Sequence, residues 1–274
     1  MKISYKIIKR LAALTNREMD LFLCLARYQK EDGRVENIYY RTILNMTGMC
    51  KQTFYTAMRS LEAKGVIVVL GKIKNDFVVK ILDNDFSNHD FSDGYINLNR
   101  EIFHKRAFKS LKANEKWLVL EMMKNTYVTG RSHQIYRNAF YEKYKKLLGV
   151  TTRMLREYLL AIKIFFSIGR KKGKYFITAK KILQGNHTAS PFKQHAEFYI
   201  KAQCRQNKIE AANKEVEDTI EYCFIKRYKR LKEAGLDIYR VFTQTLLKSV
   251  KNKAERVLNP KYINKLITEA VTNA

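Results

Sequence analysis

Two segments of the 274-residue chain share one pattern of apolar and turn residues, and this repeat constrains the fold more than any other feature. Residues 14–26 lie over residues 111–123 at an offset of 97, and residues 43–61 lie over residues 144–162 at an offset of 101. The shared positions are Leu14/Leu111, Glu18/Glu115, Leu21/Leu118, Leu23/Leu120 and Gly48/Gly149. An ancient duplication and two independent copies of one fold both produce such a pattern. In either case, the two copies are expected to fold alike.

The first copy predicts a helix, a strand, two helices joined by a tight turn, and a hairpin. Thr15 and Glu18 have the spacing of a capping box, in which side chain and backbone satisfy each other at a helix start. We expect a strand at 35–39, with Tyr39 and Tyr40 in its core, then helices at 41–46 and 51–64 around Gly48. The buried face of the second of these is predicted to be Phe54, Ala57 or Met58, and Leu61, and Gly65 ends it. The runs 66–70 and 77–82 read as a hairpin.

The second copy repeats this order. Its predicted helices are 112–124, 141–148 and 151–163, with Gly149 at the turn and Leu155, Leu159 and Ile162 on the buried face of the third helix. The runs 165–168 and 175–178 form the predicted hairpin, whose tip is 169–174.

This order of elements is that of winged helix-turn-helix domains. Residues 14–182 resemble a tandem pair of such DNA-binding domains, as found in bacterial transcription regulators and in plasmid or phage replication initiators. The resemblance implies a mainly α fold with small β-hairpin wings. It also implies that the third helix of each copy lies in the major groove of DNA while the wing and the neighbouring turns contact phosphates.

The predicted organisation is a first winged-helix domain at 1–82, an acidic linker at 83–94, a strongly basic second winged-helix domain at 95–186, and an all-α domain at 187–274. The last domain is expected to contain helices at 192–206, 210–234, 237–257 and 260–271, with Pro191 at the first helical position. The predicted apolar face of its second helix is Val216, Ile220, Cys223 or Phe224, Tyr228 and Leu231. Oligomerisation or binding of a protein partner is the expected role of these helices. The basic cluster 226–232 is either a solvated helix face or an accessory binding patch.

Charge points to a polyanionic partner. The chain has 53 Lys and Arg against 26 Asp and Glu, a net charge of +27. The net charge is +4 for residues 1–94, +16 for 95–186 and +7 for 187–274. Double-stranded DNA is therefore the expected partner, bound mainly by the middle domain. A membrane surface is not expected, because no basic amphipathic helix stands apart from a predicted core.

The second copy supplies most of the candidate DNA-binding residues. Arg153 and Arg156 on the third helix either read guanine, contact phosphates or are simply solvated. Around them, hydroxyls and cations on the same helix, on the preceding helix and on the hairpin complete the set: Lys143, Lys145, Lys146, Thr151, Thr152, Arg170, Lys171, Lys172 and Lys174.

In the first copy, the candidate DNA-binding residues are Lys51, Gln52, Thr53, Tyr55 and Arg59 on the third helix and Lys72 and Lys74 on the hairpin. Gln52 suits adenine, and Thr53 can contact a thymine methyl group. The weaker positive charge of this copy leaves two alternatives open. This copy contacts DNA bases while the second copy provides most of the binding affinity, or it does not bind DNA and forms a dimer interface instead. We expect both copies to contact DNA.

Other features predict a cytoplasmic protein without enzymatic activity, cofactor or metal. The cysteines Cys24, Cys50, Cys204 and Cys223 are scattered and read as buried thiols of a reducing cytosol. No apolar run reaches the length of a membrane span, and the N-terminus lacks the pattern of a signal peptide. The five histidines form no metal motif, and no phosphate-binding loop sequence is present.

The expected function is sequence-specific binding of double-stranded DNA by a homodimer or higher oligomer, with transcription regulation as the first expected role. One alternative is a plasmid or phage replication initiator or primosome-type protein. Another is an architectural or segregation protein that binds with little specificity.

Overall fold

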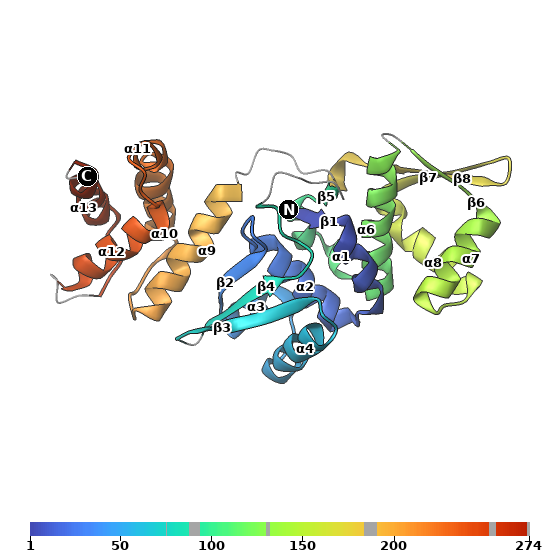
Figure 1. Cartoon of the computed structure of the whole chain (residues 1–274), viewed down its shortest axis with the longest axis horizontal. Helices are drawn as coiled ribbons and strands as arrows, with labels where there is room; N and C mark the ends of the chain where they lie inside the picture. The colour runs from blue at the N-terminus through green and yellow to red at the C-terminus, as the bar shows by residue number, and fades with distance from the viewer. Residues whose placement is uncertain (75, 88–93, 130–131, 184–190, 252–255, 273–274) are drawn as a thin grey trace. The chain divides into compact units, whose positions relative to one another are not determined.

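The computed structural model describes residues 1–74, 76–87, 94–129, 132–183, 191–251 and 256–272. It divides into two compact units, Met1–Asn186 and His187–Ala274 (Figure 1). Helices predominate in both units, and the named strands, all antiparallel, belong to the first. Within the described part of the chain, we find no helix with the length and apolar character needed to cross a membrane.

The chain begins with elements outside the predicted pattern. Strand β1 (Lys2–Ser4) pairs with β5 (Tyr95–Asn97), so that Ile3 lies opposite Ile96. Helix α1 (Tyr5–Arg10) and a 3₁₀ turn (Leu11–Ala13) directly follow β1 in the chain. After β5 come a 3₁₀ segment (Arg100–His104) and the short helix α5 (Arg106–Lys109). This pairing joins two segments that are more than 90 residues apart. A pattern of neighbouring residues in the sequence does not predict such a contact.

The first copy forms the predicted elements. They are α2 (Asn16–Tyr28), β2 (Arg34–Ile38), α3 (Tyr40–Thr47), α4 (Lys51–Ala63), β3 (Ile67–Ile73) and β4 (Asp76–Ile81), with the sheet order β2-β4-β3. The capping box is confirmed, since the backbone N–H of Thr15 donates to the Glu18 carboxylate at 2.7 Å. Gly48 ends α3 with φ of 68°, a conformation in which glycine has no Cβ penalty. The predicted face of α4, including both Ala57 and Met58, is buried.

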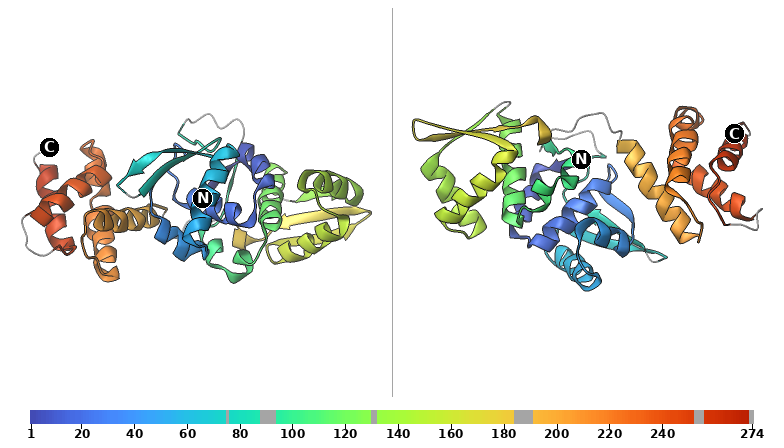
Figure 2. Two further views of the ribbon diagram at one scale, coloured as in Figure 1. Left: turned by 90° about the horizontal axis from the view of Figure 1, so that it is seen from below. Right: turned by 180° about the vertical axis from the view of Figure 1, so that it is seen from behind.

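The second copy contains α6 (Ala113–Val128), β6 (His133–Tyr136), α7 (Arg137–Leu148), α8 (Thr152–Ala161), a 3₁₀ turn (Ile162–Ile164), β7 (Phe166–Lys171), β8 (Lys174–Ala179) and a 3₁₀ turn (Lys181–Leu183). The sheet order β6-β8-β7 repeats that of the first copy. Figure 2 shows the yellow β7–β8 hairpin from two further directions. Helix α7 begins four residues before the predicted start at 141. Leu155, Leu159 and Ile162 are buried, as predicted.

The two copies pack around one continuous core. The indole N–H of Trp117 on α6 donates to the carbonyl of Ile8 on α1 at 2.7 Å, deep inside this core. Residues 1–82 and 95–186, predicted as two domains, thus lie in one compact unit. Of the predicted linker 83–94, residues 83–87 and Gly94 are described, and Asn84 and Phe86 are buried. Residues 88–93 lie outside the described part of the chain.

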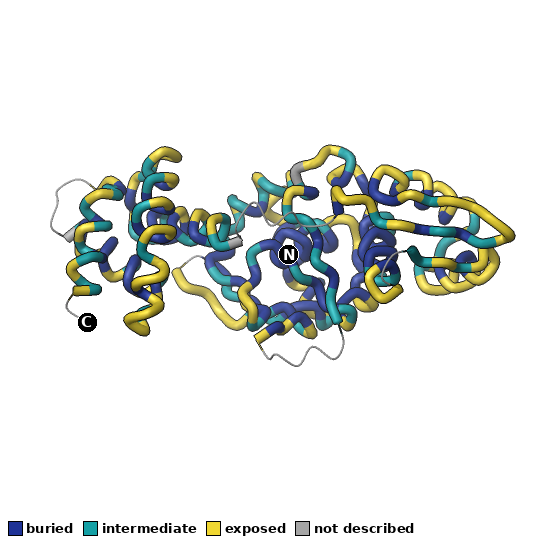
Figure 3. The backbone as a smooth tube through the Cα atoms, turned by 90° about the horizontal axis from the view of Figure 1, so that it is seen from above, coloured by how far each residue is buried: buried dark blue, intermediate teal, exposed yellow. Residues whose placement is uncertain are grey.

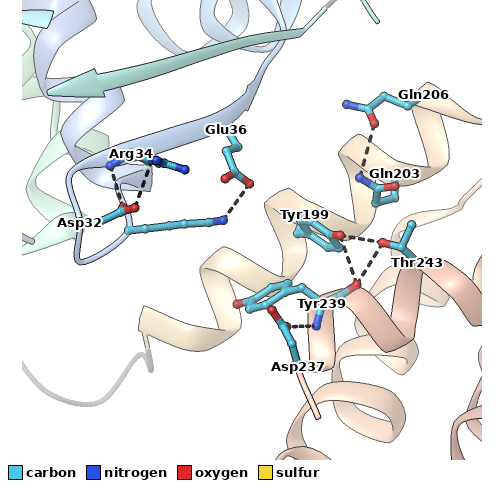
Figure 4. A network of polar contacts seen from close by, with 10 residues as sticks. Asp32, Arg34, Glu36, Tyr199, Gln203, Gln206, Asp237, Tyr239 and Thr243 are labelled. Atoms are coloured by element: carbon cyan, nitrogen blue, oxygen red, sulfur yellow. Dashed lines mark hydrogen bonds and ion pairs between the residues drawn. The ribbon is translucent and has the colours of Figure 1, made fainter. Parts of the chain in front are cut away.

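The second unit is helical, with α9 (Pro191–Gln206), α10 (Asn213–Thr219), a π-helical segment (Ile220–Ile225), α11 (Tyr228–Glu233), α12 (Ile238–Lys251) and α13 (Pro260–Thr272). The hydroxyl of Tyr199 on α9 bonds to the Thr243 hydroxyl at 2.6 Å and donates to the Tyr239 carbonyl at 3.2 Å, both on α12 (Figure 4). These contacts fix the first helix of the unit against the fourth.

The prediction of one regular helix at 210–234 was wrong. Helix α10 starts at Asn213, and the π-helical segment widens the turn before α11. The extra residue in that turn allows both Cys223 and Phe224 to be buried, whereas Tyr228 is 43% exposed. The predicted end of the next helix at 257 was also wrong, because Val257 forms an isolated parallel bridge with Glu210.

The four cysteines are free thiols, but they are not all buried. Cys24, Cys204 and Cys223 are buried, and burial raises the pKa of each to about 12. Cys50 is exposed at the N-cap of α4, which corrects the expectation of four buried thiols. Hydrogen bonding to Thr53 lowers the pKa of Cys50 below its usual range.

Candidate nucleic-acid interface

Helix α8 presents cationic side chains on its exposed face. The hydroxyl of Thr151 accepts a hydrogen bond from the backbone N–H of Met154 at 3.3 Å and so caps the helix. The side chain of Arg153 is 89% exposed and pairs with Glu157 one turn later at 3.3 Å. Arg156 is exposed, with its guanidinium carbon 5.8 Å from the ring centre of Tyr141. Thr152 is half-buried.

The hairpin of β7 and β8 carries the second cationic cluster. Lys171 pairs with Lys174, and the two-residue turn between them has positive φ at both Lys172 (46°) and Gly173 (73°), the pattern of a type I′ turn. The turn is thus tighter than the predicted tip 169–174. Arg170, Lys171 and Lys172 are exposed, and Figure 3 shows the tip of this hairpin in the colour of exposed residues. Lys174 is half-buried, with its ammonium 4.5 Å from the ring centre of Tyr136.

A groove of about 310 Å³ lies between α8 and this hairpin. Arg156 and Lys163 line it from the helical side, and Arg170 lines it from β7. Lys163 was not among the predicted DNA-binding residues, although its spacing of seven from Arg156 places the two on one helical face. Leu160, which is 61% exposed, adds an apolar strip to the same groove.

A pair of tyrosines supports the two arginines of the groove. The hydroxyls of Tyr141 on α7 and Tyr175 on β8 are 2.6 Å apart and share a hydrogen bond. The Arg156 guanidinium lies over Tyr141, and the Arg170 guanidinium lies over Tyr175 at 5.6 Å. Burial and the hydrogen bond to Tyr141 raise the pKa of Tyr175, so its phenol is neutral at physiological pH. Each ring therefore contacts one arginine of the groove without neutralising its charge.

The three lysines predicted on α7 differ in their surroundings. Lys145 and Lys146 are exposed. The ammonium of Lys143 lies 3.2 Å from the buried carboxylate of Glu121 on α6 and 4.9 Å from the ring centre of Tyr144. Lys143 thus compensates a buried charge of the protein itself, and it contributes less to the positive surface than its two neighbours.

In the first copy, α4 presents a more polar surface. Lys51, Gln52 and Arg59 are exposed, whereas Thr53 and Tyr55 are half-buried. The hydroxyl of Thr53 lies 3.1 Å from the Cys50 thiol, and the Nε of Arg59 donates to the Tyr55 carbonyl at 3.4 Å.

The N-terminal half of α4 borders a groove of about 370 Å³ against the start of α2. Glu18 lines this groove but is only 5% exposed, and it accepts hydrogen bonds from Lys64 at 2.6 Å and from Ser60 at 2.5 Å. Burial alone raises the pKa of Glu18, but the bonds from Lys64, Ser60 and Thr15 outweigh it and hold that pKa below its usual range. The carboxylate is thus neutralised internally and does not repel a polyanion as a free charge does.

The interpretation of Tyr39 and Tyr40 as strand core was wrong. Strand β2 ends at Ile38, Tyr39 is the N-cap of α3, and Tyr40 is the first residue of that helix. Both are half-buried, and the ammonium of Lys51 lies 5.2 Å from the ring centre of Tyr40. The aromatic pair thus borders the start of α4 rather than the core.

The hairpin of β3 and β4 is less basic than its counterpart. Lys72 and Lys74 are exposed, and the Lys72 ammonium lies 4.5 Å from the ring centre of Phe77. Between and beside them, Leu70 is 49% and Ile73 50% exposed. Its exposed surface is therefore partly apolar.

The repeat offset of 101 places Arg153 and Arg156 of the second copy over Gln52 and Tyr55 of the first. The two copies thus carry different chemistry at equivalent helical positions. Among the described residues, no group of three or more His, Cys, Asp or Glu side chains is arranged to hold a metal ion.

No family model, curated protein or solved structure matches this chain.

Proposed function

We propose that this chain is a sequence-specific double-stranded DNA-binding protein built on two winged helix-turn-helix modules. The repeated order of three helices and a three-stranded antiparallel sheet supports this proposal. In each copy, a glycine in the left-handed conformation, Gly48 or Gly149, separates the second helix from the third. Helices α4 and α8 are the recognition helices of the proposal, and the β3–β4 and β7–β8 hairpins are its wings.

The pair Arg156 and Arg170 carries the proposal. They come from a helix and a hairpin that are separate in sequence, yet they line one groove and rest on two hydrogen-bonded phenols. A guanidinium that stacks on a ring loses less rotamer freedom when it binds a phosphate, because the ring already restricts it. An isolated solvated arginine needs no such support.

The helix and the hairpin of the second copy have different tasks in this proposal. The major groove admits one α-helix, and α8 offers Arg153 and Arg156 on its exposed face. With α8 in that groove, the basic hairpin tip at Lys171 and Lys172 reaches the flanking backbone and contacts phosphates. The more polar α4, with Gln52 and Thr53, then reads a second segment with less electrostatic attraction.

Transcription regulation is the role we propose for this binding, with residues 187–274 as the oligomerisation or partner-binding unit and the cytoplasm as its location. Mapping of bound genomic sites separates this role from the alternatives. Peaks at promoters support it, a single cluster of repeated sites supports a replication initiator, and broad coverage supports an architectural protein.

The binding itself is tested by fluorescence anisotropy with random duplexes, followed by selection of bound sequences from a random pool. We expect affinity for duplex DNA to fall with salt, with a log–log slope of about −0.9 for each phosphate contacted. Selected sequences should bind at least about 10³-fold more tightly than random duplexes, roughly the lower limit for specific complexes. Failure of the selection to enrich any sequence would contradict specific recognition, and a salt-independent affinity would contradict DNA binding through the cationic groove.

A further inference from the structure

A second cavity lies in the first unit and shares no lining residue with the cationic groove. It measures about 100 Å³, is partly open to solvent, and is bordered by α2, the end of α3, the 3₁₀ segment Arg100–His104, α5 and α6. Leu23, Met46, Phe103 and Phe108 form its apolar walls. Arg27 and Lys109 are the cations that line it without an ion pair among the described residues. A small apolar space with unpaired positive charge is typical of a site for an organic anion.

The buried side chain of Arg27 is the main evidence for a ligand in this cavity. It is only 7% exposed, and its buried Nε has no hydrogen-bond partner among the described residues. No described carboxylate pairs with it, and its guanidinium lies 5.6 Å from the ring centre of Tyr28. A buried and unpaired charge is costly, and native proteins normally satisfy such groups with a partner.

Other charges near the cavity do not supply that partner. The one described acidic side chain in the cavity wall, Asp20, is engaged by Lys116 at 2.6 Å. Burial and the charge of Arg27 lower the pKa of Arg100, so the two cations lie within electrostatic range of each other. An anion that enters the cavity would offset the charge of Arg27.

We propose that this cavity binds a small organic carboxylate with a short apolar tail. The carboxylate pairs with the guanidinium of Arg27, which offers two parallel N–H donors to a planar anion. The tail packs against Leu23, Phe103 and Phe108. Since a cavity of about 150 Å³ holds benzene, the available space suits a tail of a few carbon atoms. A carboxylate is favoured over inorganic phosphate because four of the lining side chains are apolar and offer phosphate no donor.

The position of the cavity links it to both copies of the repeat. Met46 and Thr47 line the cavity and are the last two residues of α3. The turn at Gly48, which leads into α4, comes directly after them. Lys116, also in the cavity wall, lies on α6, the first helix of the second copy. The cavity is therefore lined by segments of both copies. The binding proposal does not depend on DNA recognition.

The test is a thermal-shift titration of the full chain with sodium isovalerate and its neutral isostere isovaleramide, at constant ionic strength. We expect isovalerate to raise the Tm in a saturable manner, as a ligand of the native state does, and isovaleramide to have little effect. Arg27→Met should weaken isovalerate binding at least about tenfold, because it removes charge-assisted hydrogen bonds. The matched control is Arg17→Met, the same substitution at an exposed position of the same helix, which should bind like the wild type.

Three results would overturn the proposal: equal shifts with isovalerate and isovaleramide, an unchanged response in Arg27→Met, or saturable stabilisation by inorganic phosphate instead of isovalerate. Should Arg27→Met fail to fold, Lys109→Met tests the same site from an exposed position. It is expected to fold normally and to bind isovalerate several-fold more weakly, and wild-type affinity in that variant would count against the site.

Discussion

The side-chain oxygen of Asn16 accepts a hydrogen bond of 2.6 Å from the backbone N–H of Ala113, the residue 97 positions later in the chain. That separation equals the offset that aligns the first segments of the two copies, so equivalent positions touch each other. Ala113 is also the first residue of α6, and Asn16 thereby satisfies one of the N–H groups that a helix start leaves without an internal partner.

Next to this contact, Asp20→Asn should destabilise the protein strongly. The Lys116 side chain is only 4% exposed, and its ammonium lies 2.6 Å from the Asp20 carboxylate. Removal of the carboxylate leaves a buried charge uncompensated, at a cost of about 3 kcal/mol in the free energy of unfolding. Urea unfolding, monitored through the fluorescence of the buried Trp117, measures this change in the free energy of unfolding. The control Asp32→Asn breaks the exposed pair with Arg34 and should cost less than about 1 kcal/mol. Equal losses in both variants would show that the Asp20–Lys116 pair has no special weight.

Glu18 should make the stability of the first unit sensitive to acid. Because hydrogen bonds hold the pKa of Glu18 below its unfolded value, its contribution is fully present above the ordinary carboxyl pKa and is lost as the pH falls through the folded value. Glu18→Gln should therefore reduce the free energy of unfolding at neutral pH by about 1 to 3 kcal/mol. The difference from the wild type should shrink towards zero as the pH falls below the ordinary carboxyl range. The exposed Glu31→Gln serves as control, and a Glu18→Gln deficit that is independent of pH would contradict the mechanism.

The β7–β8 hairpin should contribute to DNA affinity without regard to sequence. In the double variant Lys171→Gln/Lys172→Gly, glycine suits the positive φ at position 172 and both charges are removed. We expect all duplexes to bind more weakly and the log–log salt slope to fall by about 0.9 for each phosphate that the hairpin no longer binds. Lys261→Gln/Lys265→Gln, with the same charge change on exposed positions of α13, should leave the slope unaltered. If the two double variants behave alike, the hairpin is not at the DNA.

Arg153 and Arg156 should determine sequence preference instead. Arg153→Ala or Arg156→Ala is expected to cost about 1 to 3 kcal/mol on the selected duplex and much less on random duplexes. Anisotropy titrations with both duplexes provide the comparison. The adjacent Glu157→Ala removes the partner of Arg153 and should not weaken binding to either duplex. An equal loss on both duplexes would assign the arginines to phosphate contacts.

The exposed Cys50 offers a way to determine whether the first copy contacts DNA. At mildly alkaline pH a thiol reagent should modify this cysteine in the native protein, whereas Cys24, Cys204 and Cys223 should react only after unfolding. Because Cys50 is the N-cap of α4, a duplex bound along that helix should slow its modification. Mass spectrometry of the native protein with and without duplex gives the rates. An unchanged rate under saturating DNA would favour the alternative in which the first copy is a dimer face, and a concentration-dependent rate without DNA would support it directly.

Much of the local structure followed from the sequence, because its causes are local. The capping box of Thr15 and Glu18, the left-handed glycines at 48 and 149, and the buried face of α8 at Leu155, Leu159 and Ile162 each depend on residues within a few positions of one another. The spacing of apolar residues along a helix and the capping of its ends involve residues only a few positions apart, so both can be predicted from the sequence. The cations of the β7–β8 hairpin could also be predicted from the sequence, because they cluster within a few positions of one another.

The rest was decided by contacts between residues distant in the chain. The sequence contains no sign that Ile3 pairs with Ile96, that Asn16 caps α6, or that Cys50 is exposed while the other thiols are buried. It likewise did not reveal that Tyr141 and Tyr175 support Arg156 and Arg170, or that Arg27 lies buried beside an apolar cavity. Periodicity states which face of a helix is buried but not which partner covers it. The basic charge of the chain was thus a property of its sequence, whereas the positions of Arg156 and Arg170 beside one groove and of Arg27 beside a cavity were set by tertiary packing.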